Sequence, residues 1–145
     1  METGREDREV NAMLPARVKR ATKGVGSFLN IYFSLYDAEA HLWIYLCHWE
    51  LIDGTHKVET SSSISNEATV AQFFSGESLL SLETEGPEVR LILSEAKKLV
   101  LHADRNEYGD EDLLILYIPG RPPFGYGPVP GSSSDYGWNT DDSLP

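Results

Sequence analysis

The chain has 145 residues and a formal net charge of −11 at pH 7, with 41% hydrophobic and 24% charged residues. This is the size and composition of one globular domain, which excludes a wholly disordered chain. Residues 1–23 carry six basic and four acidic side chains, so residues 24–145 have a net charge of −13. Such a surface repels phosphate backbones and anionic lipid, so we expect no nucleic acid or membrane as a partner.

Cysteine content and hydropathy exclude several further classes of protein. The one cysteine, Cys47, excludes an intramolecular disulfide and a zinc site built on several thiolates. The chain has no run of about 18 apolar residues, and its first ten residues lack the hydrophobic core of a signal peptide. We therefore expect a cytoplasmic protein.

Residues 1–26 are predicted to form a flexible charged arm outside the fold. Its second half has no acid after Glu9 and carries four basic side chains, Arg17, Lys19, Arg20 and Lys23. A basic arm on an acidic body is suited to touching nucleic acid or to folding back on the body. A solvated, poorly ordered terminus is the commoner outcome and is our expectation.

The first strands are expected between residues 28 and 60. Residues 28–36 alternate apolar and polar side chains, which predicts a half-buried strand. Residues 41–52, HLWIYLCHWELI, are apolar on both faces, which predicts one central strand covered above and below. Asp53-Gly54 is a strong turn signal, so the chain is predicted to return over residues 55–60 and complete a three-strand meander.

A change of period then predicts one short helix over residues 66–74. Val70, Phe73 and Phe74 share one helix face, and Gly76 stands where a helix commonly ends. Four further strands are predicted, at 78–84, 88–93, 97–102 and 112–118. The turns EGP, which contains Gly86, and SEAKK are expected to join the first three of these strands as hairpins. The expected fold of residues 27–119 is α+β, a mostly antiparallel sheet of six to seven strands with one short helix packed on it.

Residues 120–145 form a Pro/Gly-rich tail, whose composition argues against regular structure. The tail nevertheless contains Tyr126, Tyr136 and Trp138. Aromatic side chains in such a segment either pin it to the domain or anchor a partner. The sequence leaves both readings open, and we keep these three residues as candidate partner-binding residues.

The loop at residues 103–112, ADRNEYGDED, is the most acidic segment of the chain. A helix-loop-helix calcium site needs oxygen ligands at loop positions 5 and 12, where counting from Asp104 gives Tyr108 and Ile115. The pattern therefore predicts no metal and no cofactor. We expect a surface loop whose carboxylates bind a partner: Glu107, Asp110, Glu111 and Asp112.

Histidines offer the other chemistry. His48 and Glu50 are two residues apart on one face of the expected central strand, a spacing suited to acid–base work, and His102 is a possible neighbour. The commoner explanation is the polar end of a buried strand. Hydrolase, dinucleotide and P-loop motifs are missing, so no catalytic residue is assigned.

A family pattern is visible in three stretches, LWIYLCHWELIDGTHKVETSSSISNEATVAQFFSGESLLSLE, VRLILSEAKKLVLHAD and DLLILYIPG. Over about residues 28–120 the chain resembles small single-domain bacterial proteins, some of which look like immunity proteins of polymorphic toxin systems. The resemblance implies an α+β fold and a role in binding a toxin or another partner. It transfers no catalytic residue.

Three functions are compatible with these observations. The leading expectation is a non-catalytic cytoplasmic protein-binding domain, most concretely an immunity-type inhibitor that covers a basic toxin cleft with its acidic side chains. The first alternative is a structural or adaptor module that uses the aromatic tail. The second alternative is a small-ligand-binding domain with His48 and Glu50 in a pocket.

Overall fold

The computed structural model describes residues 8, 10–23, 28–35, 38–44, 47–61, 67–94, 96–104, 107, 109, 111–120, 123–129, 131 and 135–140. Over these residues the chain forms two antiparallel sheets and a short helix, α2 (Glu67–Phe74). The seven-stranded sheet has the order β12 (Tyr136–Thr140), β11 (Phe124–Pro128), β10 (Leu114–Tyr117), β3 (Ala38–Ile44), β2 (Leu29–Leu35), β1 (Ala16–Lys23), β6 (Ser78–Leu79). The five-stranded sheet has the order β5 (His56–Thr60), β4 (His48–Asp53), β9 (Lys97–His102), β8 (Glu88–Ile92), β7 (Ser81–Glu85).

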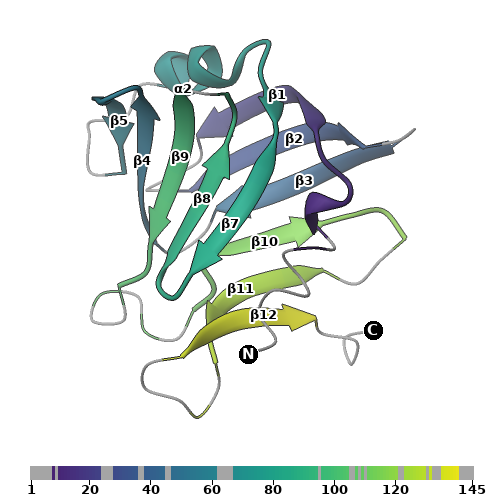
Figure 1. The fold of residues 1–145 in the computed structure, drawn as a ribbon, viewed down its shortest axis with the longest axis vertical. Helices are drawn as coiled ribbons and strands as arrows, with labels where there is room; N and C mark the ends of the chain where they lie inside the picture. Colours follow the sequence, from purple (N-terminus) through teal and green to yellow (C-terminus); the bar gives the residue numbers. More distant parts are fainter. Residues whose placement is uncertain are drawn as a thin grey trace.

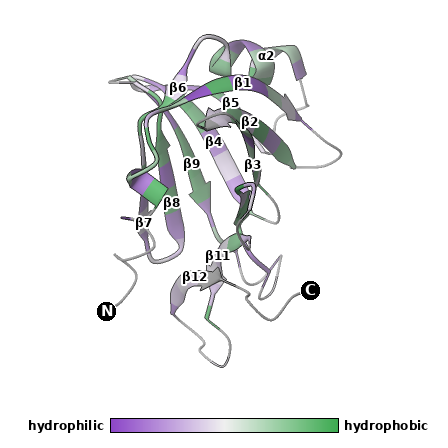
Figure 2. Cartoon of the chain, turned by 90° about the vertical axis from the view of Figure 1, so that its right-hand side faces the viewer, coloured by the Kyte–Doolittle hydropathy of each residue, from purple (hydrophilic) through white to green (hydrophobic). Residues whose placement is uncertain are grey.

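The two sheets lie one in front of the other, and in Figure 1 the strands of one run across those of the other. Figure 2 shows the same layers from the side, with α2 at one end. A single hydrophobic core joins the sheets and includes residues from both, such as Leu42 and Ile44 of β3 and Trp49 and Leu51 of β4, all fully buried. The outer face of the five-stranded sheet carries partly exposed side chains, such as His48, Glu50 and Arg90, around the buried Val100.

The predicted class, a mostly antiparallel α+β fold with one short helix, is confirmed. Val70, Phe73 and Phe74 of α2 are buried, and Gly76 adopts a φ of 76° just after the helix. The expected hairpins also form: β4 and β5 turn at Gly54, and β7 and β8 turn at Gly86, both with positive φ. The number of strands differs, with twelve in two sheets over the described residues where six to seven were expected.

The predicted central strand at 41–52 is two strands in different sheets. β3 belongs to the seven-stranded sheet and β4 to the five-stranded sheet. The three-strand meander expected between residues 28 and 60 therefore does not form. Buried side chains stand at even positions up to Ile44 and at odd positions from Cys47. Both faces of the segment are apolar because its two halves bury opposite faces into one core. Tyr45 and Leu46, between them, lie outside the described residues.

The predicted strand at 78–84 is divided in the same way. β6 pairs with β1 in one sheet, and β7 pairs with β8 in the other. Leu79 and Leu82 are buried three positions apart, while Leu80 between them is 45% exposed. Strands that change sheets make the corners of a sandwich, and this segment is the second corner of the fold.

Part of the expected N-terminal arm is a strand. β1 lies between β2 and β6 and buries Ala16, Val18 and Ala21, with a bulge between Val18 and Arg20. The small apolar side chains alternate with charged ones that face solvent, so the strand carries little hydrophobic signal. The expectation of a solvated terminus is therefore wrong for residues 16–23.

Part of the expected tail is also a strand pair. β11 and β12 form a hairpin that extends the seven-stranded sheet beyond β10, and every residue of β11 is buried. The expectation of no regular structure is wrong for these two strands. The flexible arms that the sequence predicts extend into residues 1–7 and 141–145, which lie outside the described residues.

Candidate functional site

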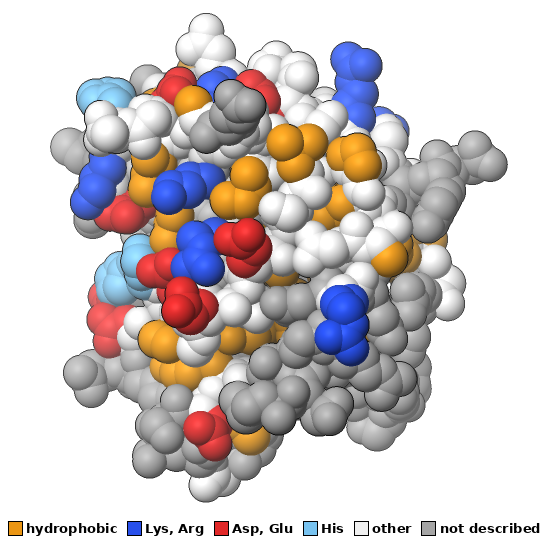
Figure 3. Space-filling model, viewed as in Figure 1, with side chains coloured by type: hydrophobic (Ala, Val, Ile, Leu, Met, Phe, Trp, Pro, Cys, Tyr) orange, Lys and Arg blue, Asp and Glu red, His pale blue; other side chains and the backbone are white. Residues whose placement is uncertain are grey.

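Polar side chains gather at one end of the outer face of the five-stranded sheet. His48 of β4 lies opposite His102 of β9, which lies opposite Glu88 of β8, which lies opposite Glu85 of β7. Because directly opposed residues of neighbouring strands project from the same face, these four form one row. Figure 3 views the molecule from this side and shows acidic, basic and histidine side chains grouped together.

Beside this row, ion pairs link β8 to β7 and β5 to β4. Arg90 of β8 bonds to Glu83 and Glu85, each at 3.2 Å, and to Glu88. The hydrogen bond from Arg90 to Glu88, more than the others, raises the pKa of the guanidinium. Glu50 accepts from Lys57 Nζ at 2.8 Å, and this bond lowers the pKa of the Glu50 carboxyl.

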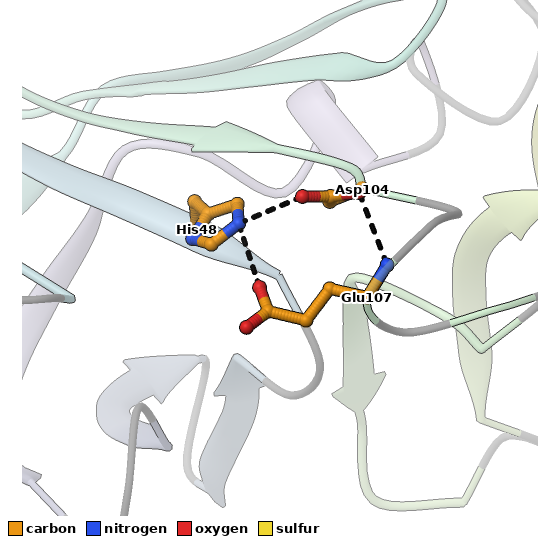
Figure 4. A group of neighbouring side chains, drawn as sticks. All are labelled: His48, Asp104 and Glu107. Atoms are coloured by element: carbon orange, nitrogen blue, oxygen red, sulfur yellow. Dashed lines mark hydrogen bonds and ion pairs between the residues drawn. The ribbon is translucent and has the colours of Figure 1, made fainter.

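His48 stands at the start of β4 and faces two carboxylates from the segment after β9. Its Nε2 lies 3.1 Å from Asp104 Oδ2 and 2.9 Å from Glu107 Oε2 (Figure 4). The other Asp104 oxygen, Oδ1, accepts the backbone N–H of Glu107 at 3.1 Å. One ring nitrogen and two carboxylate oxygens thus lie within 4.8 Å of one another, and this set is able to hold a metal ion.

The predicted pairing of His48 with Glu50 is only partly met. Both residues project from the outer face of β4, as expected, but Glu50 contacts Lys57 and His102 Nε2, the latter at 3.5 Å. His48 instead contacts carboxylates of the segment after β9, where Asp104 lies 56 positions later in the chain. The register of β4 against β9 brings these residues together. Their spacing in the sequence therefore gives no sign of the contact.

The four predicted partner-binding carboxylates do not share one environment. Glu107 and Glu111 are exposed, and Asp110 lies outside the described residues. Asp112 is partly buried against the backbone of Gly125 and Gly127 in β11. Burial, followed by the charge of Glu111, raises the pKa of the Asp112 carboxyl. Asp112 therefore packs within the fold, whereas Glu107 and Glu111 face solvent.

The three predicted aromatic residues of the tail contribute to the fold. Tyr126 is 1% exposed, and its hydroxyl donates to the carbonyl of Gly86 at 2.7 Å. Tyr136 and Trp138 are partly buried against the core, and the Trp138 ring lies 5.2 Å from that of Tyr126. Of the two readings left open, the structure favours pinning of the tail, and Tyr126 has no surface to offer a partner.

Cys47 precedes His48 but faces the core. It is fully buried, its Sγ lies 3.7 Å from the carbonyl oxygen of Leu113, and burial raises the pKa of its thiol to about 12. A thiol in this setting is protonated at neutral pH and is a poor nucleophile. Because His48 lies on the outer face, the two side chains do not form a pair.

Two hollows lie away from this site. An apolar one between the seven-stranded sheet and the segment before β1, lined in part by Phe33, Leu42 and Met13, has a volume of about 20 Å³, enough for about one water-sized sphere and too little for a small organic ligand. The other is an open groove between β1 and α2. Its Lys19 lies 3.1 Å from Glu39 of β3, so the basic segment folds back on an acid of the body.

No helix in the described part of the chain has the length and apolar character needed to cross a membrane. No family model matches the chain, and neither a curated protein nor a solved structure matches it. Its function is therefore inferred from the geometry of its own residues.

Proposed function

We propose that this chain is a non-catalytic cytoplasmic domain that binds a basic protein, acting as an immunity-type inhibitor of a toxin. The binding surface is the acidic end of the five-stranded sheet. We use this name for five residues: Glu85, Glu88, Asp104, Glu107 and Glu111.

The observation that carries the proposal is that carboxylates from two segments meet at one end of the sheet, because the row of Glu85, Glu88, His102 and His48 ends at Asp104 and Glu107. Glu85 and Glu88 flank the β7–β8 turn, and the three others follow β9. The backbone N–H of Ala103 donates to the carbonyl of Pro87 at 2.8 Å, which ties the start of the second segment to that turn. The β7–β8 turn is further held by the Tyr126 hydroxyl. The backbone beside Glu85, Glu88 and Asp104 is thus anchored.

Its electrostatics suit association with a basic surface. Side-chain exposure is 77% at Glu85 and 53% at Glu107, so both carboxylates can reach a partner without rearrangement of the sheet. Opposite potentials speed encounter and make it sensitive to salt, with association rates reaching on the order of 10⁸–10⁹ M⁻¹s⁻¹ when steering is strong.

Apolar surface lies farther along the same sheet. Ile52 and Ile92 are partly exposed on its outer face, and Leu80 at the nearby corner is 45% exposed. Figure 3 shows apolar side chains above the charged group. An acidic end with adjacent apolar side chains has the character of a protein interface, where apolar contacts supply affinity and charges select the partner.

The experiment compares two variants of equal charge. Glu85→Gln with Glu111→Gln removes two charges from the acidic end, and Asp53→Asn with Glu67→Gln removes two from exposed positions elsewhere. Tagged proteins are used to recover partners from native lysate at low and high salt. We expect a basic partner with the wild type and the control, reduced recovery with the first variant, and loss at high salt. Equal recovery by both variants would contradict the proposal.

A further inference from the structure

We propose that His48, Asp104 and Glu107 form a binding site for a divalent transition-metal ion, with Zn²⁺ as the ion to test. The site is a property of the chain by itself and does not depend on a protein partner. It differs from the sequence-based expectation of no metal, which rested on the local spacing of candidate ligands along the chain.

The two distances from the ring nitrogen to the carboxylate oxygens are close to those of an occupied site. Zinc binds imidazole nitrogen at about 2.0–2.1 Å and carboxylate oxygen at about 2.0–2.2 Å, so neighbouring ligand atoms of a tetrahedral site lie about 3.3–3.5 Å apart. Here His48 Nε2 lies 3.1 Å from Asp104 Oδ2 and 2.9 Å from Glu107 Oε2. An outward movement of a few tenths of an ångström admits the ion.

The direction of the side chains also favours a cation between them. Both carboxylates point to the same ring nitrogen of His48 (Figure 4). One N–H donates a well-aligned hydrogen bond to one acceptor, so a proton on Nε2 serves only one of the two carboxylates well. A divalent ion at that place contacts the nitrogen and both oxygens, and it offsets the repulsion between the two carboxylates.

The ligands are held before an ion arrives. Asp104 uses Oδ1 to accept the Glu107 N–H, which leaves Oδ2 directed at His48. His48 is part of β4, and the pairing of β4 with β9 fixes the backbone of His48 opposite His102. A site whose ligands are already oriented loses less conformational entropy on binding.

The ligand set indicates the class of ion. Imidazole suits zinc, copper, iron and nickel, whereas calcium wants about six to eight oxygen ligands. One nitrogen and two carboxylates therefore select a transition metal over Ca²⁺ or Mg²⁺. Three protein ligands also leave a coordination position for water, as in zinc sites that keep an open position.

The test is calorimetric titration of the purified full chain with ZnCl₂. We expect one ion per chain, and a loss of at least about tenfold in affinity for His48→Ala. His102→Ala is the matched control, because the two side chains lie opposite each other and are each 43% exposed. Its affinity is expected to stay within about twofold of the wild type, since its ring contacts Glu50 and Glu88.

Two further measurements keep the proposal falsifiable if His48→Ala folds poorly. Asp104→Asn and Glu107→Gln keep side-chain size on the segment after β9 and are expected to weaken zinc binding. Zinc should also shift the NMR signal of Nε2 of His48 and leave that of His102 in place. Unchanged zinc affinity in all three ligand variants would overturn the site. So would equal loss in His102→Ala, or Ca²⁺ binding as strong as Zn²⁺ binding and indifferent to His48→Ala.

Discussion

Alanine at position 125 or 127 is expected to destabilise the fold, by different routes. Each glycine of β11 lies against Asp112, which precedes β10. A β-carbon at position 125 would overlap the end of the Asp112 side chain, meeting Oδ2. A β-carbon at position 127 would lie 2.5 Å from Asp112 Oδ1 and 2.7 Å from Asp112 Cα, so it would also overlap the backbone.

The magnitudes follow from what has to move. Overpacking in a core costs about 1–3 kcal/mol. At position 125 only a side chain must turn away, which places Gly125→Ala near the lower end of that range. At position 127 the backbone must shift, which places Gly127→Ala near the upper end. For a domain of this length, thermal midpoints fall by roughly 3–4 °C per kcal/mol, so we expect losses of about 4 °C and about 10 °C.

Asp112→Ala separates the two routes in a double-mutant cycle. Removing the carboxylate should restore most of the stability lost in Gly125→Ala, because the three heavy atoms nearest to that β-carbon all belong to the Asp112 carboxylate. It should restore little in Gly127→Ala, because the Asp112 Cα remains. The assay is thermal and urea unfolding followed by circular dichroism. Equal rescue of both glycine variants, or no loss in either, would refute the packing of Asp112 against β11.

Four other predictions concern titration, truncation and the thiol. The pKa of Asp112 in the folded state lies above its unfolded value, so the charge of this carboxylate opposes folding at neutral pH. Asp112→Asn should therefore raise the melting temperature at pH 7. This gain should vanish as the pH falls through the folded pKa. Glu50→Gln should lower the melting temperature at pH 7, because the pKa of Glu50 is lowered in the folded state and its charge therefore favours folding. The difference in melting temperature between this variant and the wild type should close as the pH falls. Deleting residues 120–145 removes buried Phe124 and Tyr126, whose burial contributes about 3–6 kcal/mol together, and the truncated chain should show no cooperative unfolding transition. Cys47 should react with a thiol reagent only after denaturant is added, and rapid reaction in the native protein would contradict its burial.

Local signals predicted the elements whose partners are close in sequence. The helix face of Val70, Phe73 and Phe74 and the turns at Gly54 and Gly86 are confirmed, because each depends on residues a few positions apart. β9 is also found where its pattern predicts it, at Lys97–His102.

The corners were missed because a change of sheet resembles a continuous strand. From β3 to β4 the buried positions change from even to odd, and from Leu79 to Leu82 they change from odd to even, whereas a single strand keeps one parity. In the first corner the intervening residues are themselves apolar, so the shift of phase is hidden. In the second, Leu80 is apolar yet exposed. Hydropathy does not distinguish a core residue from an exposed one at a corner.

The candidate site was predicted only in pieces. Glu107 was identified from the acidity of its loop, and His48 from its spacing to Glu50. Their meeting depends on the register of β4 against β9, which is set by side chains packed between two sheets. Only the folded chain brings them together.

Photo-cross-linking tests most directly where the partner binds. A photoreactive residue replaces Glu111 at the acidic end or Asp53 in the β4–β5 turn at the other end of β4; both positions are exposed. The binding proposal predicts that a basic protein in native lysate cross-links from position 111 and not from position 53. Cross-linking from position 53 without any from position 111 would contradict it.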